Sequence, residues 1–84
     1  MTYTVPAEFQ LIRVRLDERG QPTALFWGST EYPIERISNS YRVPGGSLEQ
    51  PECRHYYEIT TSGWLMRIYH DLQTDEWGVE ELYD

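Results

Sequence analysis

Residues 54–71 constrain the fold most strongly, because their pattern predicts two strands joined by a two-residue turn. Apolar and polar residues alternate with a period of two on both sides of Ser62 and Gly63, a pair suited to a tight hairpin turn. With that turn, Ile59 lies opposite Met66 on an apolar face, and opposite charges meet on the other face. A shift of one residue would invert both faces, so the sequence predicts this register.

The same alternation recurs along the rest of the chain, and no segment has the apolar spacing of an amphipathic helix. The pattern predicts six strands joined mostly by short polar or glycine-containing turns. Their ranges are 8–17, 23–28, 31–43 with a break inside, 54–61, 64–71 and 76–83. The longer connection at residues 44–53 is predicted to be a flexible loop.

Six short strands with one apolar face and no covering helix must fold that face onto itself. We therefore predict an all-β fold in which residues 1–84 form a single domain, because two domains in so short a chain would each lack a sufficient core. The strands should form a six-stranded antiparallel meander curled into a small barrel or tight sandwich. The predicted interior comprises Ile12, Val14, Leu16, Leu25, Trp27, Tyr32, Ile34, Ile37, Tyr57, Ile59, Trp64, Met66, Ile68, Trp77 and Val79.

Further pairings follow from the other connections. A turn around residues 73–74 predicts the pairs Ile68 with Val79, His70 with Trp77, Tyr69 with Gly78 and Arg67 with Glu80. In the N-terminal half, Tyr32 and Ile34 are predicted to lie opposite Trp27 and Leu25. Ile37 has the wrong parity for that strand, so we expect a β-bulge near Glu35 and Arg36.

The charge of the chain excludes some classes of partner. Fourteen acidic residues oppose seven arginines, and the formal net charge is -7. This charge disfavours binding to nucleic-acid phosphates or to anionic membrane surfaces. No apolar run is long enough to span a bilayer and the N-terminus lacks a signal-peptide pattern, so we expect a cytoplasmic protein with no membrane partner. The single cysteine, Cys53, fits a reducing compartment.

The segments FWGSTEYPIERI, YYEITTSGWLMRIYHD and WGVEELYD, in this order, resemble a family of small bacterial domains of unknown function. The matching residues are Gly20, Pro22, Phe26, Trp27, Gly28, Tyr32, Trp77, Tyr83 and Asp84. Some members of that family accompany lesion-bypass DNA polymerases, so the resemblance implies a non-catalytic accessory role and no catalytic residues. Where the family usually has a basic residue after the glycine, this chain has Ser29.

One group of residues suggests a metal site or a catalytic site. The predicted hairpin register places His55 beside His70, with Cys53 two residues before His55. Zinc could accept all three side chains, but a fourth ligand is missing and the spacing matches no common structural zinc site. A Cys-His nucleophile pair would also lack an orienting carboxylate and an oxyanion donor. We therefore predict no cofactor and no enzyme activity, and keep this group as an alternative.

The predicted outer face of the last three strands is the main candidate for binding. It carries Tyr56, Leu65, Tyr69 and Leu82 around Arg67, and residues of these types are common at protein interfaces. Ordinary packing on a β-surface would explain the same residues. The hypothesis is a non-catalytic binding module whose partner is another protein or a second copy of the chain.

A second surface gives the alternative of single-stranded nucleic-acid binding. Arg13 and Arg15 lie near Phe26 on the outer face of the first predicted hairpin. Basic groups beside an aromatic ring can contact phosphates and stack on a base. The net charge of the chain opposes this alternative.

Overall fold

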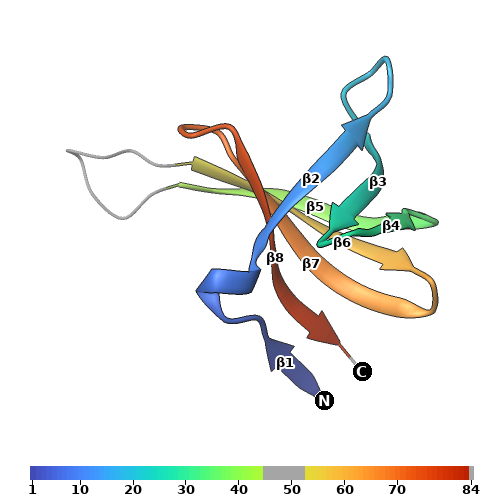
Figure 1. Cartoon of the computed structure of the whole chain (residues 1–84). Coiled ribbons are helices and arrows are strands. Elements are labelled where there is room, and N and C mark those ends of the chain that lie inside the picture. The colour runs from blue at the N-terminus through green and yellow to red at the C-terminus, as the bar shows by residue number, and fades with distance from the viewer. Residues whose placement is uncertain (45–52, 84) are drawn as a thin grey trace.

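The computed structural model describes residues 1–44 and 53–83, and these residues form an all-β antiparallel sheet (Figure 1). Its elements are β1 Thr2–Thr4, the 3-10 helix η1 Ala7–Phe9, β2 Leu11–Leu16, β3 Pro22–Trp27, β4 Thr30–Pro33, β5 Arg36–Pro44, β6 Cys53–Thr61, β7 Trp64–Asp71 and β8 Glu76–Tyr83. The strand order is β4-β3-β2-β8-β7-β6-β5, and β1 pairs with β8. The flexible loop predicted at residues 44–53 falls almost entirely outside the described residues.

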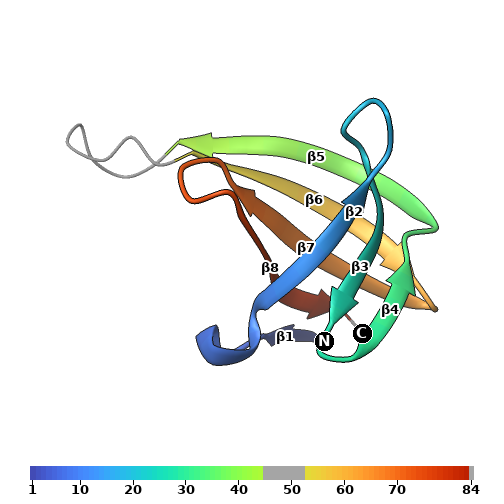
Figure 2. The same ribbon diagram turned by 45° about the horizontal axis from the view of Figure 1, so that its top comes forward.

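The sheet curls into a half-barrel with two layers. Strands β5 to β8 form one curved layer, and β2, β3 and β4 fold over one side of it (Figures 1 and 2). The predicted all-β fold is therefore confirmed, with eight strands in the described residues where six were expected. No helix in this part of the chain has the length and apolar character needed to cross a membrane.

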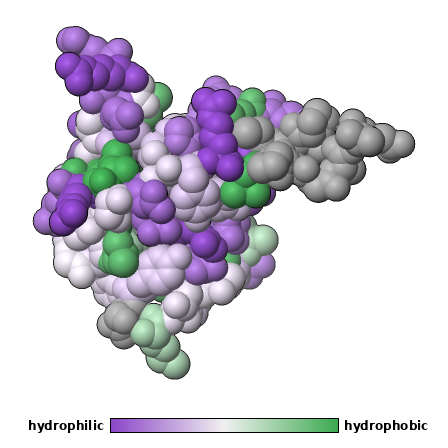
Figure 3. Space-filling model, turned by 180° about the vertical axis from the view of Figure 1, so that it is seen from behind, coloured by the Kyte–Doolittle hydropathy of each residue, from purple (hydrophilic) through white to green (hydrophobic). Residues whose placement is uncertain are grey.

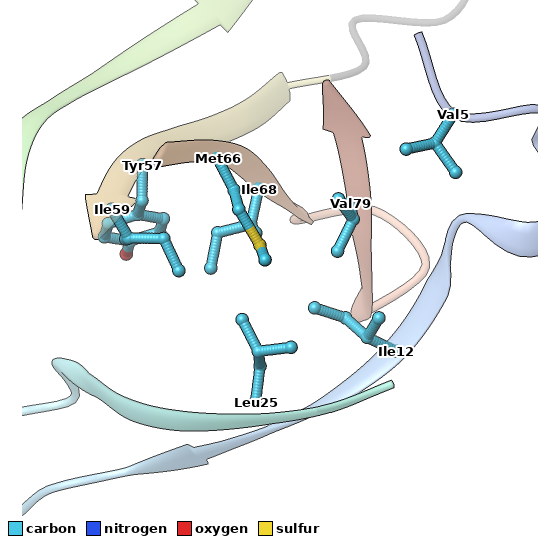
Figure 4. Packing of buried hydrophobic residues seen from close by; sticks show 8 residues of the cluster. All are labelled: Val5, Ile12, Leu25, Tyr57, Ile59, Met66, Ile68 and Val79. Carbon is cyan, nitrogen blue, oxygen red and sulfur yellow. The ribbon is translucent and has the colours of Figure 1, made fainter. Parts of the chain in front are cut away.

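The core lies between the two layers. Leu25 of β3 points toward Ile59 of β6 and Ile68 of β7, and all three side chains are completely inaccessible to solvent (Figure 4). The other members of the buried cluster are Val5, Ile12, Tyr57, Met66 and Val79. Burial of these apolar side chains, contributed by both layers, is the main force that holds the half-barrel together.

The register of β6 and β7 agrees with the sequence prediction at every pair from Arg54 with Asp71 to Thr61 with Trp64. The β3–β4 hairpin differs, because Tyr32 lies opposite Leu25 instead of Trp27. This is a shift of two residues, which keeps the same side chains on the inner face. The error is therefore in the register and not in the choice of face.

The predicted long strand at 31–43 is divided between the two layers. The backbone N–H of Ile34 donates to Thr23 of β3, whereas that of Glu35 donates to Thr60 of β6. The expected bulge near Glu35 and Arg36 is thus a break between β4 and β5. Beyond it, Ile37 lies opposite Ile59 and packs against the core, and a register shift follows at Ser38.

The N-terminal residues differ most from prediction. The strand expected at 8–17 begins at Leu11, and the residues before it form β1 and η1. Between these two elements Val5 is only 2% exposed, and its N–H donates to the carbonyl of Glu80. A single valine between Thr4 and Pro6 gives no period-two signal, so the sequence did not identify it as a core residue.

Two residues predicted to be interior are exposed. Leu16 is 45% exposed and Trp64 is 47% exposed. Leu16 ends β2, beyond the residues that pair with β8, and Trp64 begins β7 directly after the hairpin turn. Both side chains point to the same side of the sheet as the core residues, but they lie beyond the ends of the core.

Candidate functional site

Tyrosines and arginines form a layer on the outer face of β5 to β7, which we call the tyrosine–arginine cluster: Tyr41, Tyr56, Tyr69, Arg54 and Arg67. The rings of Tyr41 and Tyr56 stack with centroids 5.5 Å apart, and those of Tyr56 and Tyr69 lie 6.2 Å apart. The guanidinium of Arg54 lies 4.2 Å from the centre of the Tyr69 ring, and that of Arg67 lies 5.5 Å from that of Tyr56. Groups of the chain itself therefore occupy faces of these tyrosine rings.

Carboxylates of β7 and β8 balance the charges of this cluster. Arg67 bonds Glu80 at 3.2 Å and also bonds Glu81, while Arg54 lies 3.7 Å from Asp71 and 3.9 Å from Glu80. Burial acts to lower the pKa of Arg67, but a hydrogen bond with Tyr41 and the nearby acidic groups outweigh it and raise that pKa. The cluster thus pairs its charges within the chain and links β5 to β8, although Arg67 Nε and Glu80 Oε2 are buried without a hydrogen-bond partner among the described residues.

The interface predicted on this face is only partly assembled. Tyr56 and Arg67 lie in the cluster, both partly buried, but Tyr69 is only 8% exposed and covers Gly78. A β-bulge at Glu80 pairs Arg67 with Glu81 instead of the expected Glu80.

Leu82 therefore lies opposite Met66 and packs against the core, so its expected place on the outer face is wrong. Leu65 is 38% exposed but lies at the start of β7, beside Trp64 and Tyr83. Seen from behind, hydrophobic residues occur as separate spots among hydrophilic ones and form no continuous patch on that face (Figure 3).

The structure brings Arg13, Arg15 and Phe26 together on the first hairpin, as the nucleic-acid alternative requires. The guanidinium groups lie 5.7 Å and 5.3 Å from the centre of the Phe26 ring, and Arg15 also pairs with Glu31 at 3.4 Å. The two arginines thus occupy the ring on which a base would stack. A nucleic-acid strand would have to displace them.

The two histidines lie opposite each other, as predicted, but each contacts a different aromatic ring. His55 stacks on Tyr57 and bonds its hydroxyl through Nδ1 at 3.2 Å. His70 stacks on Trp77 with ring centres 4.2 Å apart, and its Nε2 lies 2.7 Å from Asp75. The side chain of Cys53 lies outside the described part of the structure, and the described residues contain no group of three metal-ligating side chains.

The environment of His55 disfavours its charged form. Burial, and then the charges of Arg42 and His70, lower the pKa of His55 below its ordinary value. The imidazole is therefore neutral at pH 7 and acts as part of the aromatic packing at this end of the core.

An open groove of about 770 Å³ lies between β2 and the turn that joins β7 to β8. Its apolar walls include Ile12, Val14 and Leu16 of β2, Phe26 of β3 and Trp77 of β8, and its polar wall consists of His70, Asp75 and Glu76. The groove exists because β2 pairs with β8 through Leu11 and Ile12 and then diverges from it (Figure 1).

The edge of β2 in this groove carries backbone groups with no strand partner in the described part of the chain. The carbonyl of Gln10 accepts from Val79 of β8, whereas the N–H of Asp17 donates to Gln21 on the β3 side. Because backbone groups alternate in direction along a strand, those of Val14 and Leu16 point into the groove. The groove thus combines apolar walls with a free strand edge.

Comparison with known proteins gives no relative for this chain. No protein-family model matches the sequence, and no curated protein or solved structure is significantly similar. The resemblance to the small bacterial domains stays a prediction.

Sequence reasoning missed the groove and its polar wall. The available signal was Asp71 before Gln73 and Thr74, because an aspartate two or three residues before a turn can accept backbone N–H groups and fix the turn. The structure has these bonds, at 3.0 Å from Gln73 and 3.1 Å from Thr74. The divergence of β2 from β8 has no comparable signal in the sequence.

Proposed function

We propose that this protein is a non-catalytic module that binds an extended segment of another protein in the groove between β2 and the β7–β8 turn. The observation that carries the proposal is the free edge of β2 at Val14 and Leu16, which lies beside an apolar groove. A segment bound there would add a strand to the sheet, with main-chain hydrogen bonds supplying affinity.

The lining of the groove supports an extended ligand. Bound segments in strand addition place alternate side chains in pockets, and the apolar residues Val14, Leu16 and Trp77 line the groove beside the free edge. Leu16 is 45% exposed, which is unusual for a core-facing leucine and leaves apolar surface for a partner to cover.

The groove supports binding better than do the two surfaces predicted from the sequence, the outer face of the last strands and the Phe26 surface of the first hairpin. The charges of the outer tyrosine–arginine cluster pair with one another and its rings contact its own arginines, and Phe26 lies beside arginines of the same hairpin. The groove, in contrast, has backbone groups that a ligand can satisfy.

Substitution at Leu16 tests the proposal. A displayed library of random ten-residue peptides is selected on the wild-type protein, and the enriched peptides are measured against Leu16→Pro and Leu16→Ala. Proline removes the N–H that faces the groove, and an edge strand tolerates this loss where the N–H has no partner in the sheet. Alanine keeps the N–H and removes the exposed side chain.

We expect Leu16→Pro to weaken binding about threefold to tenfold more than Leu16→Ala, which is the effect of one lost hydrogen bond. In the wild type, the peptide should also slow amide hydrogen exchange at Val14 and Leu16. Circular dichroism checks that both variants fold. Enriched peptides that bind all three proteins equally, or a selection that enriches none, would exclude the groove as the binding site.

A further inference from the structure

We infer that the segment bound in the groove is basic, with Lys or Arg alternating with apolar residues; this inference rests on the proposed function. The wall opposite β2 carries two neighbouring carboxylates, Asp75 and Glu76. The Asp75 side chain is 89% exposed, and Glu76 is exposed as well. Neither forms an ion pair with an arginine among the described residues.

The turn that carries these carboxylates is fixed before any ligand arrives. Asp71 accepts the N–H groups of Gln73 and Thr74, and its carbonyl accepts the N–H of Asp75 at 2.8 Å. Asp75 has a left-handed backbone with φ of 60°, and one of its oxygens contacts His70. Little backbone conformational entropy is therefore lost when a cation binds at this wall.

The groove lining carries more negative than positive charge, because Asp75 and Glu76 stand against one arginine, Arg13. The guanidinium of Arg13 lies 5.7 Å from the centre of the Phe26 ring on the β2–β3 side of the groove, and Arg15, over the same ring, pairs with Glu31. A cationic segment complements Asp75 and Glu76, whereas an acidic segment would meet two carboxylates that no arginine neutralises among the described residues.

The charge of the whole chain selects against a second copy as the occupant. Each chain carries a formal charge of -7, so two copies repel each other, whereas a basic segment is attracted. Because side chains alternate along an extended segment, one set can lie against Val14 and Trp77 while the other set reaches the acidic wall. This geometry predicts basic and apolar residues at alternating positions.

The test uses the same peptide library and a pair of charge-matched variants. Asp75→Asn with Glu76→Gln removes two charges at the wall, and asparagine tolerates the left-handed backbone of Asp75. The control, Glu8→Gln with Glu18→Gln, removes two exposed charges from residues that do not line the groove. Each variant is used both for a new selection and for measurement of the peptides enriched by the wild type.

We expect wild type and control to enrich peptides with alternating basic and apolar residues, and the wall variant to lose this preference. The affinity of the best basic peptide should fall about fivefold in the wall variant and stay nearly unchanged in the control, as expected for exposed ion pairs. Higher salt should weaken its binding to the wild type more than to the wall variant.

The outcomes separate this inference from the proposed function. Enriched peptides that depend on Leu16 but are neutral or acidic would contradict the inference of a basic partner. The same conclusion follows if the enriched peptides bind the wall variant as tightly as the wild type. In both cases the groove remains the binding site. If peptide affinity falls equally in the wall variant and the control, the effect comes from net charge alone, and this result also contradicts the inference of a basic partner. If no enriched peptide depends on Leu16, the proposed function fails and this inference fails with it.

Discussion

Among single residues, Gly78 has a packing role that the sequence indicates and the structure defines. The pairing of Tyr69 with Gly78 was predicted, and in the structure a Cβ at residue 78 would overlap the Tyr69 ring. Replacing a strand glycine by alanine normally leaves a protein at least as stable, so the overlap with the Tyr69 ring determines whether Gly78→Ala stabilises or destabilises this one. We expect Gly78→Ala to destabilise the protein by about 1–3 kcal/mol in a urea titration, because it overpacks the ring.

A double-mutant cycle identifies the cause. Tyr69→Leu in the Gly78→Ala background should cost less than Tyr69→Leu alone, since the smaller side chain removes the overlap. Additive effects of the two substitutions would mean that the ring does not limit residue 78.

The pKa of His55 predicts how stability changes with pH. Burial and the charges of Arg42 and His70 lower this pKa in the folded state, so the folded protein binds fewer protons than the unfolded chain just below pH 6.5. The free energy of unfolding should therefore decrease as the pH falls from about 6.5 through the folded pKa. His55→Gln should flatten this part of the profile in thermal or urea unfolding, and an unchanged slope would show that other groups cause it.

Among the elements, the β6–β7 hairpin gives a direct test of its two faces. Ile59 is completely buried, whereas the neighbouring Thr60 is only partly buried on the other face. Ile59→Ala should lower the free energy of unfolding by about 2–5 kcal/mol, because it leaves a cavity in the core. Thr60→Ala is the control and should change stability by less than about 1 kcal/mol. Similar losses in both variants would contradict the assigned faces.

The elements also show where sequence reasoning succeeds and where it fails. The β6–β7 register was predictable because a two-residue turn, an apolar face and opposite charges all require the same pairing. The β7–β8 register failed after Ile68, because the acidic residues Glu80 and Glu81 follow each other and either can pair with Arg67. A bulge of one residue reverses the faces beyond it, which moved Leu82 from the predicted outer face to the core.

In the whole molecule, the position of the groove depends on how the two layers meet. The alternation pattern predicted the strands and most of the core, because burial imposes a period of two. It did not predict that β2 leaves β8 after Ile12, because the alternation of apolar residues continues without interruption through Val14 and Leu16. The candidate site was therefore visible only in three dimensions, although several of its residues had been identified as core.

The pairing of the layers predicts unequal stability across the molecule. Strands β6 and β7 pair along their whole length, whereas β2 pairs with β8 at Leu11 and Ile12. Regions with fewer buried contacts open at lower free energy, so amides of β2 to β4 should exchange with solvent faster than those of β6 and β7. Leu25→Ala should widen this difference, because Leu25 is the completely buried residue that β3 contributes to the core. Hydrogen exchange followed by NMR measures both effects. Uniform protection in the wild type, or an equal loss of protection in all strands of the variant, would show that the half-barrel opens only as a single unit.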